Sequence, residues 1–223
     1  MTRTAWMASV VALWFAGSAL AVEPDLPDQV AEQVRAAEQV GLPVAPLQQK
    51  AREGLAKGLP PERIAPVLRR LTEQMRAAEG ALGDAAQGPD RGEMLHAAAM
   101  ARQAGATDEG LAEAAGEAHR VRAMWCFGDL LGLEAGEKEA LRLVHAAAHS
   151  GEPEASYRET ITAMRRLQES GMAPDAAARH MHQVMARGEP PMASIPEHAG
   201  GPAHAGDDGG MPWQGADDPP GGN

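Results

Sequence analysis

The chain has 223 residues, enough for one or two domains, with 20 Lys and Arg residues against 31 Asp and Glu residues. This acidic balance argues against nucleic-acid binding, which needs clustered positive charge. The chain is poor in aromatic and β-branched residues and rich in helix formers, and no stretch alternates apolar and polar residues as a strand does, so we expect an all-α protein.

Residues 1–21 are predicted to be a secretory signal peptide. Arg3 provides the positive start, an apolar run follows at residues 7–16, and Ala19 and Ala21 supply the small residues of a cleavage site. The apolar run is shorter than the roughly 20 residues that a membrane-spanning helix needs. We therefore expect cleavage near Ala21, a periplasmic or extracellular mature chain, and no membrane span within it.

Helix-stopping signals divide the next region into about eight short helices. Gly adopts the left-handed conformation that ends many helices, and Pro is accepted in the first turn of the next one. The repeated Gly-Leu-Pro at residues 41–43 and 58–60 therefore indicates two such stops. The apolar spacing predicts helices at about residues 28–41, 44–58, 61–82, 90–104, 107–132, 134–149, 153–171 and 174–188.

Some positions in the first half allow finer predictions. Asp28 can cap the first helix. Pro66 lies inside the third helix, which we expect to start late or to kink there, and Val67 is predicted to face inward. The polar connection at residues 83–92 contains Gly and Pro and is the predicted hinge.

The fifth helix has one cap with two candidates and two weak points. Thr107 or Asp108 is predicted to cap it, and Gly116 and Gly128 can break it. Cys126 is the single cysteine of the chain, so no internal disulfide can form. It is predicted to be either a small buried hydrophobic residue or the partner in an intermolecular disulfide.

The second helix has a counterpart near the end of the helical region. A shift of 130 residues without gaps places Gly41 on Gly171 and Gly58 on Gly188. Glycine recurs at helix ends in any helical protein, but the gapless match favours a duplication. In either case we expect residues 22–188 to form one domain of short antiparallel helices, packed as a helical-repeat bundle or a short α-solenoid.

Residues 189–223 differ in composition from the rest. This segment has 15 Gly and Pro residues among 35, six acids, and neither Lys nor Arg. Such a composition buries too little apolar surface to order itself, so we predict a disordered acidic tail. Residues 192–195 are the exception, because they can form a last turn on the helical domain.

Residues 41–64 resemble a group of exported bacterial proteins with no known activity. That group carries Gly-Leu-Pro-x-x-Pro-Leu-x-x-Lys-Ala-x-Glu-Gly-x-x-Lys-Gly-x-Pro-x-x-Arg-Ile after a signal peptide. The matching residues here are Gly41, Leu42, Pro43, Pro46, Leu47, Lys50, Ala51, Glu53, Gly54, Lys57, Gly58, Pro60, Arg63 and Ile64. The resemblance covers about a tenth of the chain and implies export and a helical architecture.

The same stretch contains the candidate partner-binding residues Lys50, Glu53 and Lys57. Their spacing places them on one helix face, where the carboxylate can pair with both ammonium groups. Such pairs are ordinary on helix surfaces. The alternative hypothesis is a recognition face for a protein partner.

Histidines supply the candidate metal ligands, which are His145, His149, His180 and His182. His145 and His149 stand one helical turn apart and can share an ion, although Ala146 occupies the position where a zinc protease has Glu. Together with nearby methionines these histidines suggest copper or zinc, whereas methionine on an apolar helix face usually fills the core.

No catalytic motif is present in the sequence, such as a nucleophile elbow, a phosphate loop or a haem-attachment site. We therefore expect an exported, non-catalytic protein that acts by protein contact, as an interaction or accessory factor of the cell envelope. The alternative hypothesis is a periplasmic protein that binds copper or zinc through His and Met. No other cofactor is expected.

Overall fold

A computed structural model of the chain describes residues 26–195. The predicted signal peptide and the part of the predicted tail after residue 195 lie outside the described residues. Within them the chain is all-α, as expected, and contains no strand. The α-helices are α1 (Asp28–Gln39), α2 (Ala45–Ala56), α3 (Pro61–Leu82), α4 (Arg91–Gln103), α5 (Asp108–Ala115), α6 (Arg120–Gly132), α7 (Glu137–Ala148), α8 (Pro153–Glu169) and α9 (Pro174–Ala186). Two short 3-10 helices, η1 (Gly83–Ala86) and η2 (Pro191–Ser194), complete the set.

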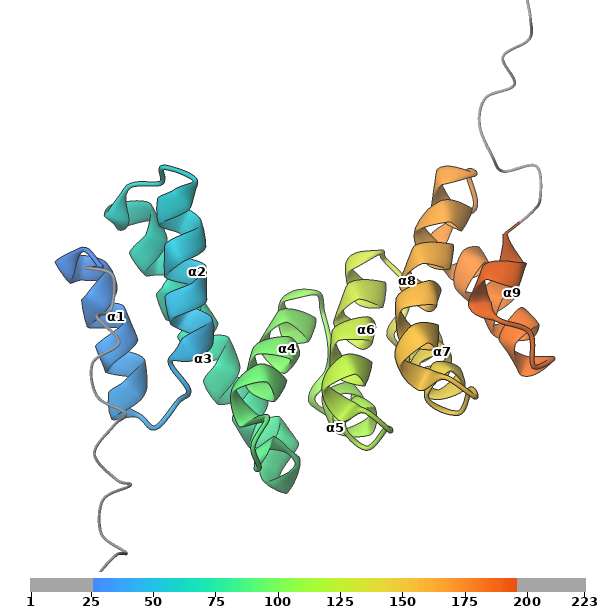
Figure 1. Ribbon diagram of the computed structural model, residues 1–223, viewed down its shortest axis with the longest axis horizontal. Coiled ribbons are helices and arrows are strands. Elements are labelled where there is room, and N and C mark those ends of the chain that lie inside the picture. The colour runs from blue at the N-terminus through green and yellow to red at the C-terminus, as the bar shows by residue number, and fades with distance from the viewer. Residues whose placement is uncertain (1–25, 196–223) are drawn as a thin grey trace, which may run out of the picture.

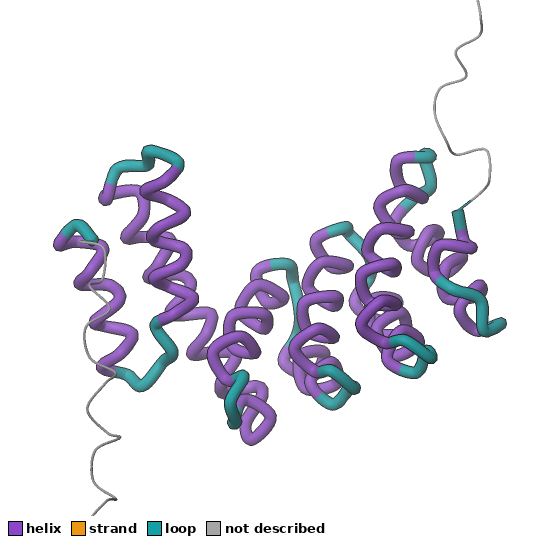
Figure 2. The backbone as a smooth tube through the Cα atoms, viewed as in Figure 1, coloured by secondary structure: helices purple, strands orange, loops and turns teal. Residues whose placement is uncertain are grey.

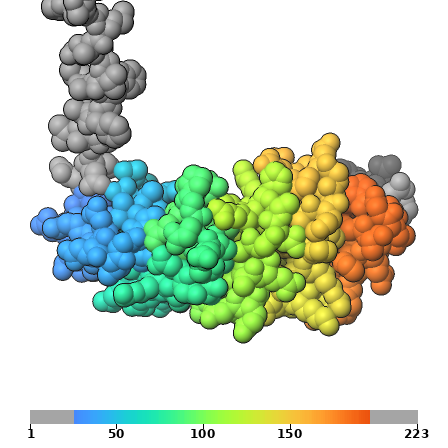
Figure 3. Space-filling view, turned by 90° about the horizontal axis from the view of Figure 1, so that it is seen from below, coloured from blue at the N-terminus to red at the C-terminus, as the bar shows by residue number. Residues whose placement is uncertain are grey.

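The helices lie in two rows that run along the molecule (Figure 1). α1, α3, α5, α7 and α9 each contact the next member of one row, which we call the odd row. α2, α4, α6, α8 and η2 form the even row in the same way. Short loops connect helices of alternating direction, and the chain order follows the long axis from one end to the other (Figures 2 and 3).

Small residues bring the middle helices of the even row close together. The contact between α4 and α6 is the most extensive between any two elements. A Cβ atom placed on Gly128 of α6 would lie 3.2 Å from the Cα atom of Ala101 of α4. The fully buried alanines of α4 are Ala97, Ala98, Ala99 and Ala101. One core of Ala, Leu, Met and Val side chains extends through both rows from α1 to α9.

The predicted helix stops are confirmed by the backbone. Gly41 and Gly58 have φ angles of +77° and +70°, a conformation that Gly adopts without steric cost. After α1, the amide of Gly41 donates to the Glu38 carbonyl and the amide of Leu42 donates to the Ala37 carbonyl. This pair of bonds is a Schellman motif, which satisfies two carbonyl groups at the helix end.

Two predictions in the first half were wrong, and so was one of the two alternatives for the third helix. Asp28 is the first helical residue and Pro27 occupies the cap position, so the Asp28 side chain makes no cap bond. α3 begins at Pro61, not late, and continues through Pro66, where a kink stays a prediction. Pro66 lies on the exposed side of the helix, where water can reach the carbonyl that its missing N–H leaves unpaired. Val67 follows it on that side and is 47% exposed rather than buried.

The predicted fifth helix is two helices, α5 and α6, which lie in different rows. The break follows Gly116, and His119 adopts a left-handed conformation with a φ angle of +52° before α6 begins. Gly128, the second predicted weak point, lies inside α6 and serves packing instead. The Thr107 cap is confirmed, because its hydroxyl accepts a hydrogen bond from the amide of Gly110.

The two segments that match under a shift of 130 residues do not occupy equivalent places. α2 contacts α4 and belongs to the even row, whereas its counterpart α9 contacts α7 and belongs to the odd row. A duplication of helix pairs would keep each copy in the same row. The match therefore reflects shared helix-start and helix-stop chemistry better than a copied structural unit.

The predicted hinge at residues 83–92 is bonded to other elements. Arg120 donates to the carbonyls of Ala85 and Gln87 at 3.1 and 3.0 Å. Arg91 pairs with Glu79 and so connects the end of the segment to α3. A hinge motion in this segment stays a prediction.

The first residues of the predicted tail belong to the helical body. η2 packs against α8 and α9, and Pro191 and Ser194 are buried. The expected last turn on the body is therefore confirmed. Between residues 26 and 195 no helix is both long enough and apolar enough to cross a membrane.

Candidate functional site

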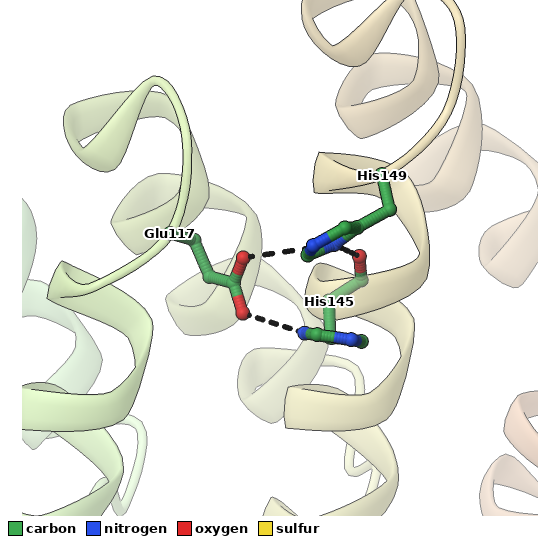
Figure 4. Close-up of side chains that lie close together, drawn as sticks. All are labelled: Glu117, His145 and His149. Atoms are coloured by element: carbon green, nitrogen blue, oxygen red, sulfur yellow. Dashed lines mark hydrogen bonds and ion pairs between the residues drawn. The ribbon is translucent and has the colours of Figure 1, made fainter.

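Two predicted metal ligands meet a third side chain between α5 and α7. His145 and His149 stand one turn apart at the end of α7, and Glu117 lies in the turn that separates α5 from α6 (Figure 4). The Nδ1 atom of His145 lies 2.8 Å from one carboxylate oxygen of Glu117. The Nδ1 atom of His149 lies 4.0 Å from the other oxygen. One potential ligand atom from each residue lies within 4.8 Å of the other two.

The turn that carries Glu117 is held on the side of α8. The Tyr157 hydroxyl donates to the Ala118 carbonyl at 2.8 Å, and desolvation, followed by the nearby Glu117 charge, raises the pKa of this phenol. His119 lies 3.7 Å from Glu154. Because the two residues that follow Glu117 both contact α8, the carboxylate, which is 14% exposed, has little freedom to move away.

The two imidazole rings are exposed and open to solvent. Their side chains are 63% and 64% exposed, and their ring centroids lie 4.1 Å apart. His149 donates from Nδ1 to the His145 carbonyl at 2.9 Å. His145 lines a hollow of about 570 Å³ and His149 lines another of about 480 Å³. Water and a small ion can therefore reach both rings.

The other two predicted ligands lie apart from this cluster. The Nε2 atom of His180 lies 3.0 Å from the Ser194 carbonyl, so this ring links α9 to η2. His182 lines the same hollow as His145 but does not belong to the group of converging ligand atoms in the described part of the chain. Met181, between them, is fully buried in the core.

The predicted partner-binding residues form an ion-paired face on α2. Glu53 accepts hydrogen bonds from Lys57 at 2.5 Å and from Lys50 at 3.0 Å. These two ammonium groups lower the pKa of the exposed Glu53 carboxyl to about 2. The Glu53 carboxylate is therefore paired with both lysines. Two ammonium groups against one carboxylate leave this face with a net positive charge.

This face borders a groove that α2, α3 and α4 form together. It consists of two adjacent hollows of about 140 and 230 Å³, which share the lining residues Lys50 and Val67. Val67 and Leu59 are 47% and 40% exposed, and they are two of the three large apolar side chains that the described residues expose. We call this feature the α2–α4 groove. Its lining residues are Lys50, Glu53, Gly54, Lys57, Leu59, Arg63, Ile64, Pro66, Val67, Arg70, Leu71, His96, Met100 and Gln103.

The α2–α4 groove is basic although the chain is acidic. Lys50, Lys57, Arg63 and Arg70 line it against the single acid Glu53. His96 lies at its inner side and contacts Trp125 edge to face at 5.1 Å. Partial burial, followed by the nearby Lys50 charge, lowers the pKa of His96, so this ring favours its neutral form.

Sequence patterns could not identify Glu117 as a neighbour of the two histidines, because it is 28 residues away from His145. The nearest signal was Gly116, which indicated a break at this point. The exposed position of Val67 was missed for a related reason. Its spacing fits the apolar face of α3, and only the packing of neighbouring helices determines which positions of that face are buried. Cys126 is 1% exposed, which agrees with the interpretation as a small buried hydrophobic residue.

Comparison with known proteins gives no match: no family model, curated protein or solved structure is similar to this chain. The resemblance at residues 41–64 therefore stays a prediction, and the site must be interpreted from its own geometry.

Proposed function

We propose that this chain is an exported, non-catalytic interaction protein of the cell envelope, whose α2–α4 groove binds an acidic peptide segment of a protein partner. The observation that carries this proposal is the combination of exposed Leu59 and Val67 with four surrounding cations. Exposed apolar side chains rimmed by charge are typical of recognition surfaces. Export is supported by the N-terminal sequence pattern and by the resemblance at residues 41–64.

The groove favours a particular chemistry in its partner. An apolar side chain can cover Leu59 and Val67, while flanking carboxylates face Lys57, Arg63 and Arg70. Opposite charges at the rim increase the association rate and select against basic partners more than they increase affinity. An extended peptide with an apolar centre and acids on both sides meets these requirements.

Residues 205–220 of the chain itself provide a probe of this chemistry. The segment has Met211-Pro212-Trp213 at its centre, Asp207-Asp208 before it and Asp217-Asp218 after it. A labelled peptide of this sequence is expected to bind a chain that stops at Ile195, and therefore lacks its own copy of the segment, with a Kd on the order of 10–100 µM. Binding should weaken several-fold between low and high salt, because the charges at the rim are screened.

Charge-reversal and apolar variants test the groove. Lys50→Glu/Lys57→Glu and Leu59→Ser/Val67→Ser should each lower affinity for the peptide at least about fivefold, since each removes one half of the recognition chemistry. Arg76→Glu/Arg158→Glu is the matched charge control, because both arginines are exposed and lie outside the groove. Circular dichroism checks that every variant folds.

A pull-down from the envelope fraction completes the test. A native partner should be recovered with the wild type and with the control variant, and lost with both groove variants. Equal recovery with all variants would show that the groove is not the binding surface.

A further inference from the structure

We propose that Glu117, His145 and His149 form a binding site for one Zn²⁺ ion, which joins the α5–α6 turn to the end of α7. The site is independent of the α2–α4 groove, since none of the three residues lines it. It replaces the expected set of four histidines with two of them and a carboxylate that the sequence did not indicate.

The separations between the side chains suit a small ion. Zn²⁺ binds imidazole nitrogen at about 2.0–2.1 Å and carboxylate oxygen at about 2.0–2.2 Å in tetrahedral geometry, which separates neighbouring ligand atoms by about 3.3–3.5 Å. The His145–Glu117 distance of 2.8 Å and the His149–Glu117 distance of 4.0 Å lie on either side of that value. The three ligand atoms all lie within 4.8 Å of one another, so shifts of about 1–1.5 Å bring them into range, and the His149 ring gives up the hydrogen bond from Nδ1 to the His145 carbonyl when it binds.

One of the three side chains is held in place, and the other two can move towards an ion. Glu117 is largely shielded, and its turn is anchored by Tyr157. The two histidine rings are mostly exposed and can rotate about their side-chain bonds to meet an ion. When Nδ1 of His145 binds the ion, the neutral ring carries its hydrogen on Nε2. The hydrogen bond between His145 and Glu117 is then replaced by bonds from both side chains to the same ion.

The donor set selects among metals. Two imidazoles and a carboxylate suit Zn²⁺, whereas Cu⁺ prefers thiolate and thioether ligands and Ca²⁺ prefers oxygen. Met181, the methionine between His180 and His182, is fully buried and cannot reach a solvent-exposed ion. The hollows beside His145 and His149 leave room for water in the fourth position. Cu²⁺ accepts the same nitrogen and oxygen ligands and, by the usual order of affinities, binds them more tightly.

Titration calorimetry with Zn²⁺ tests the site. The mature chain should carry His198→Ala/His204→Ala, because these two histidines lie outside the described residues and can bind metal on their own. We expect one ion per chain with a Kd below about 10 µM, as imidazole sites with a function reach. Glu117→Gln, His145→Ala and His149→Ala should each weaken binding at least about tenfold, because each removes one of three protein ligands.

Two control variants and a spectrum make the result specific. Glu113→Gln changes the same charge on the neighbouring helix, and His180→Ala removes a histidine outside the cluster; both should keep the wild-type affinity. Co²⁺ bound in place of Zn²⁺ should give the visible absorption of a tetrahedral site, and Glu117→Gln should change it. Cu²⁺ binding that is lost in His145→Ala supports the same ligand set. The proposal is overturned if the wild type does not bind Zn²⁺, or if His145→Ala and His149→Ala bind it unchanged.

Discussion

Glu53 is an exposed residue whose carboxyl nevertheless has a strongly lowered pKa. Although its carboxyl is exposed, hydrogen bonds from Lys57 and then Lys50 lower its pKa from 4.5 to about 2. A folded-state pKa below the unfolded value stabilises the fold above pH 4.5, and this contribution is lost as the pH falls towards 2. Because solvent screens exposed pairs, the effect on total stability is small.

An NMR titration of the Glu53 side chain checks this pKa. We expect a midpoint near 2 in the wild type and a shift towards 4.5 in Lys57→Met, because Lys57 is the largest cause of the lowering. Lys50→Met should have a smaller effect. Lys138→Met, on distant α7, is the control, and an unshifted Glu53 midpoint in Lys57→Met would contradict the assigned pairing.

Cys126 should be unreactive in the folded protein. Its side chain is buried, its sulfur lies 3.7 Å from the Tyr157 carbonyl, and burial raises the pKa of the thiol. Because the thiolate is the reactive form, a thiol-specific reagent should react at least about a hundredfold more slowly with the native chain than with the chain in denaturant. The mature protein should also run as a monomer on a non-reducing denaturing gel. Rapid native labelling or a disulfide-linked dimer would contradict the buried position.

At the level of the helices, the contact between α4 and α6 depends on a residue without a side chain. Gly128 lies against the backbone of Ala101, which cannot move aside as a flexible side chain can. Gly128→Ala should therefore lower the free energy of unfolding relative to the same change at Gly132 by about 1–3 kcal/mol through overpacking. Gly132→Ala is the matched control in the same helix, since nothing lies within 4 Å of the added methyl group. Urea unfolding measures both variants, and equal stabilities would show that the two helices can separate without cost.

Helix ends and helix packing obey different rules in this chain. The Thr107 cap is a local feature, and the bond between Thr107 and Gly110 spans three residues. The placement of α5 and α6 in different rows is not local, because it depends on which neighbours bury their apolar faces. The apolar pattern of residues 107–132 fits one long helix and two short helices equally well, so it does not distinguish between them.

At the scale of the whole molecule, the folded body extends beyond Gly188, although the composition of the segment that follows predicts disorder. η2 covers α8 and α9, and Met192 and Ile195 pack against the core. A chain that stops at Gly188 should lose about 2 kcal/mol of stability relative to the full mature chain, roughly the burial of one large apolar side chain. A chain that stops at Ile195 keeps η2 and should match the full chain. Thermal unfolding of the three proteins measures the difference, and equal stability of all three would place η2 outside the folded body.

Much of this architecture is determined by the sequence alone. Helix formers, the absence of strand patterns and glycines at helix ends predicted an all-α chain with helix boundaries close to those observed. These features depend on interactions over a few residues, such as a left-handed Gly41 or the one-turn spacing of His145 and His149. Such features depend only on residues a few positions apart, so the sequence of a short segment is enough to predict them.

Only the tertiary structure decided what those local elements do together. It placed Glu117 beside His145 and His149, separated His180 from them, and exposed Val67 where the two hollows of a basic groove meet. Each of these facts depends on contacts between residues that are far apart in the chain, and helix periodicity specifies a face without naming its neighbour. The order of helices in two rows supplies that neighbour, because burial of apolar faces selects which elements meet.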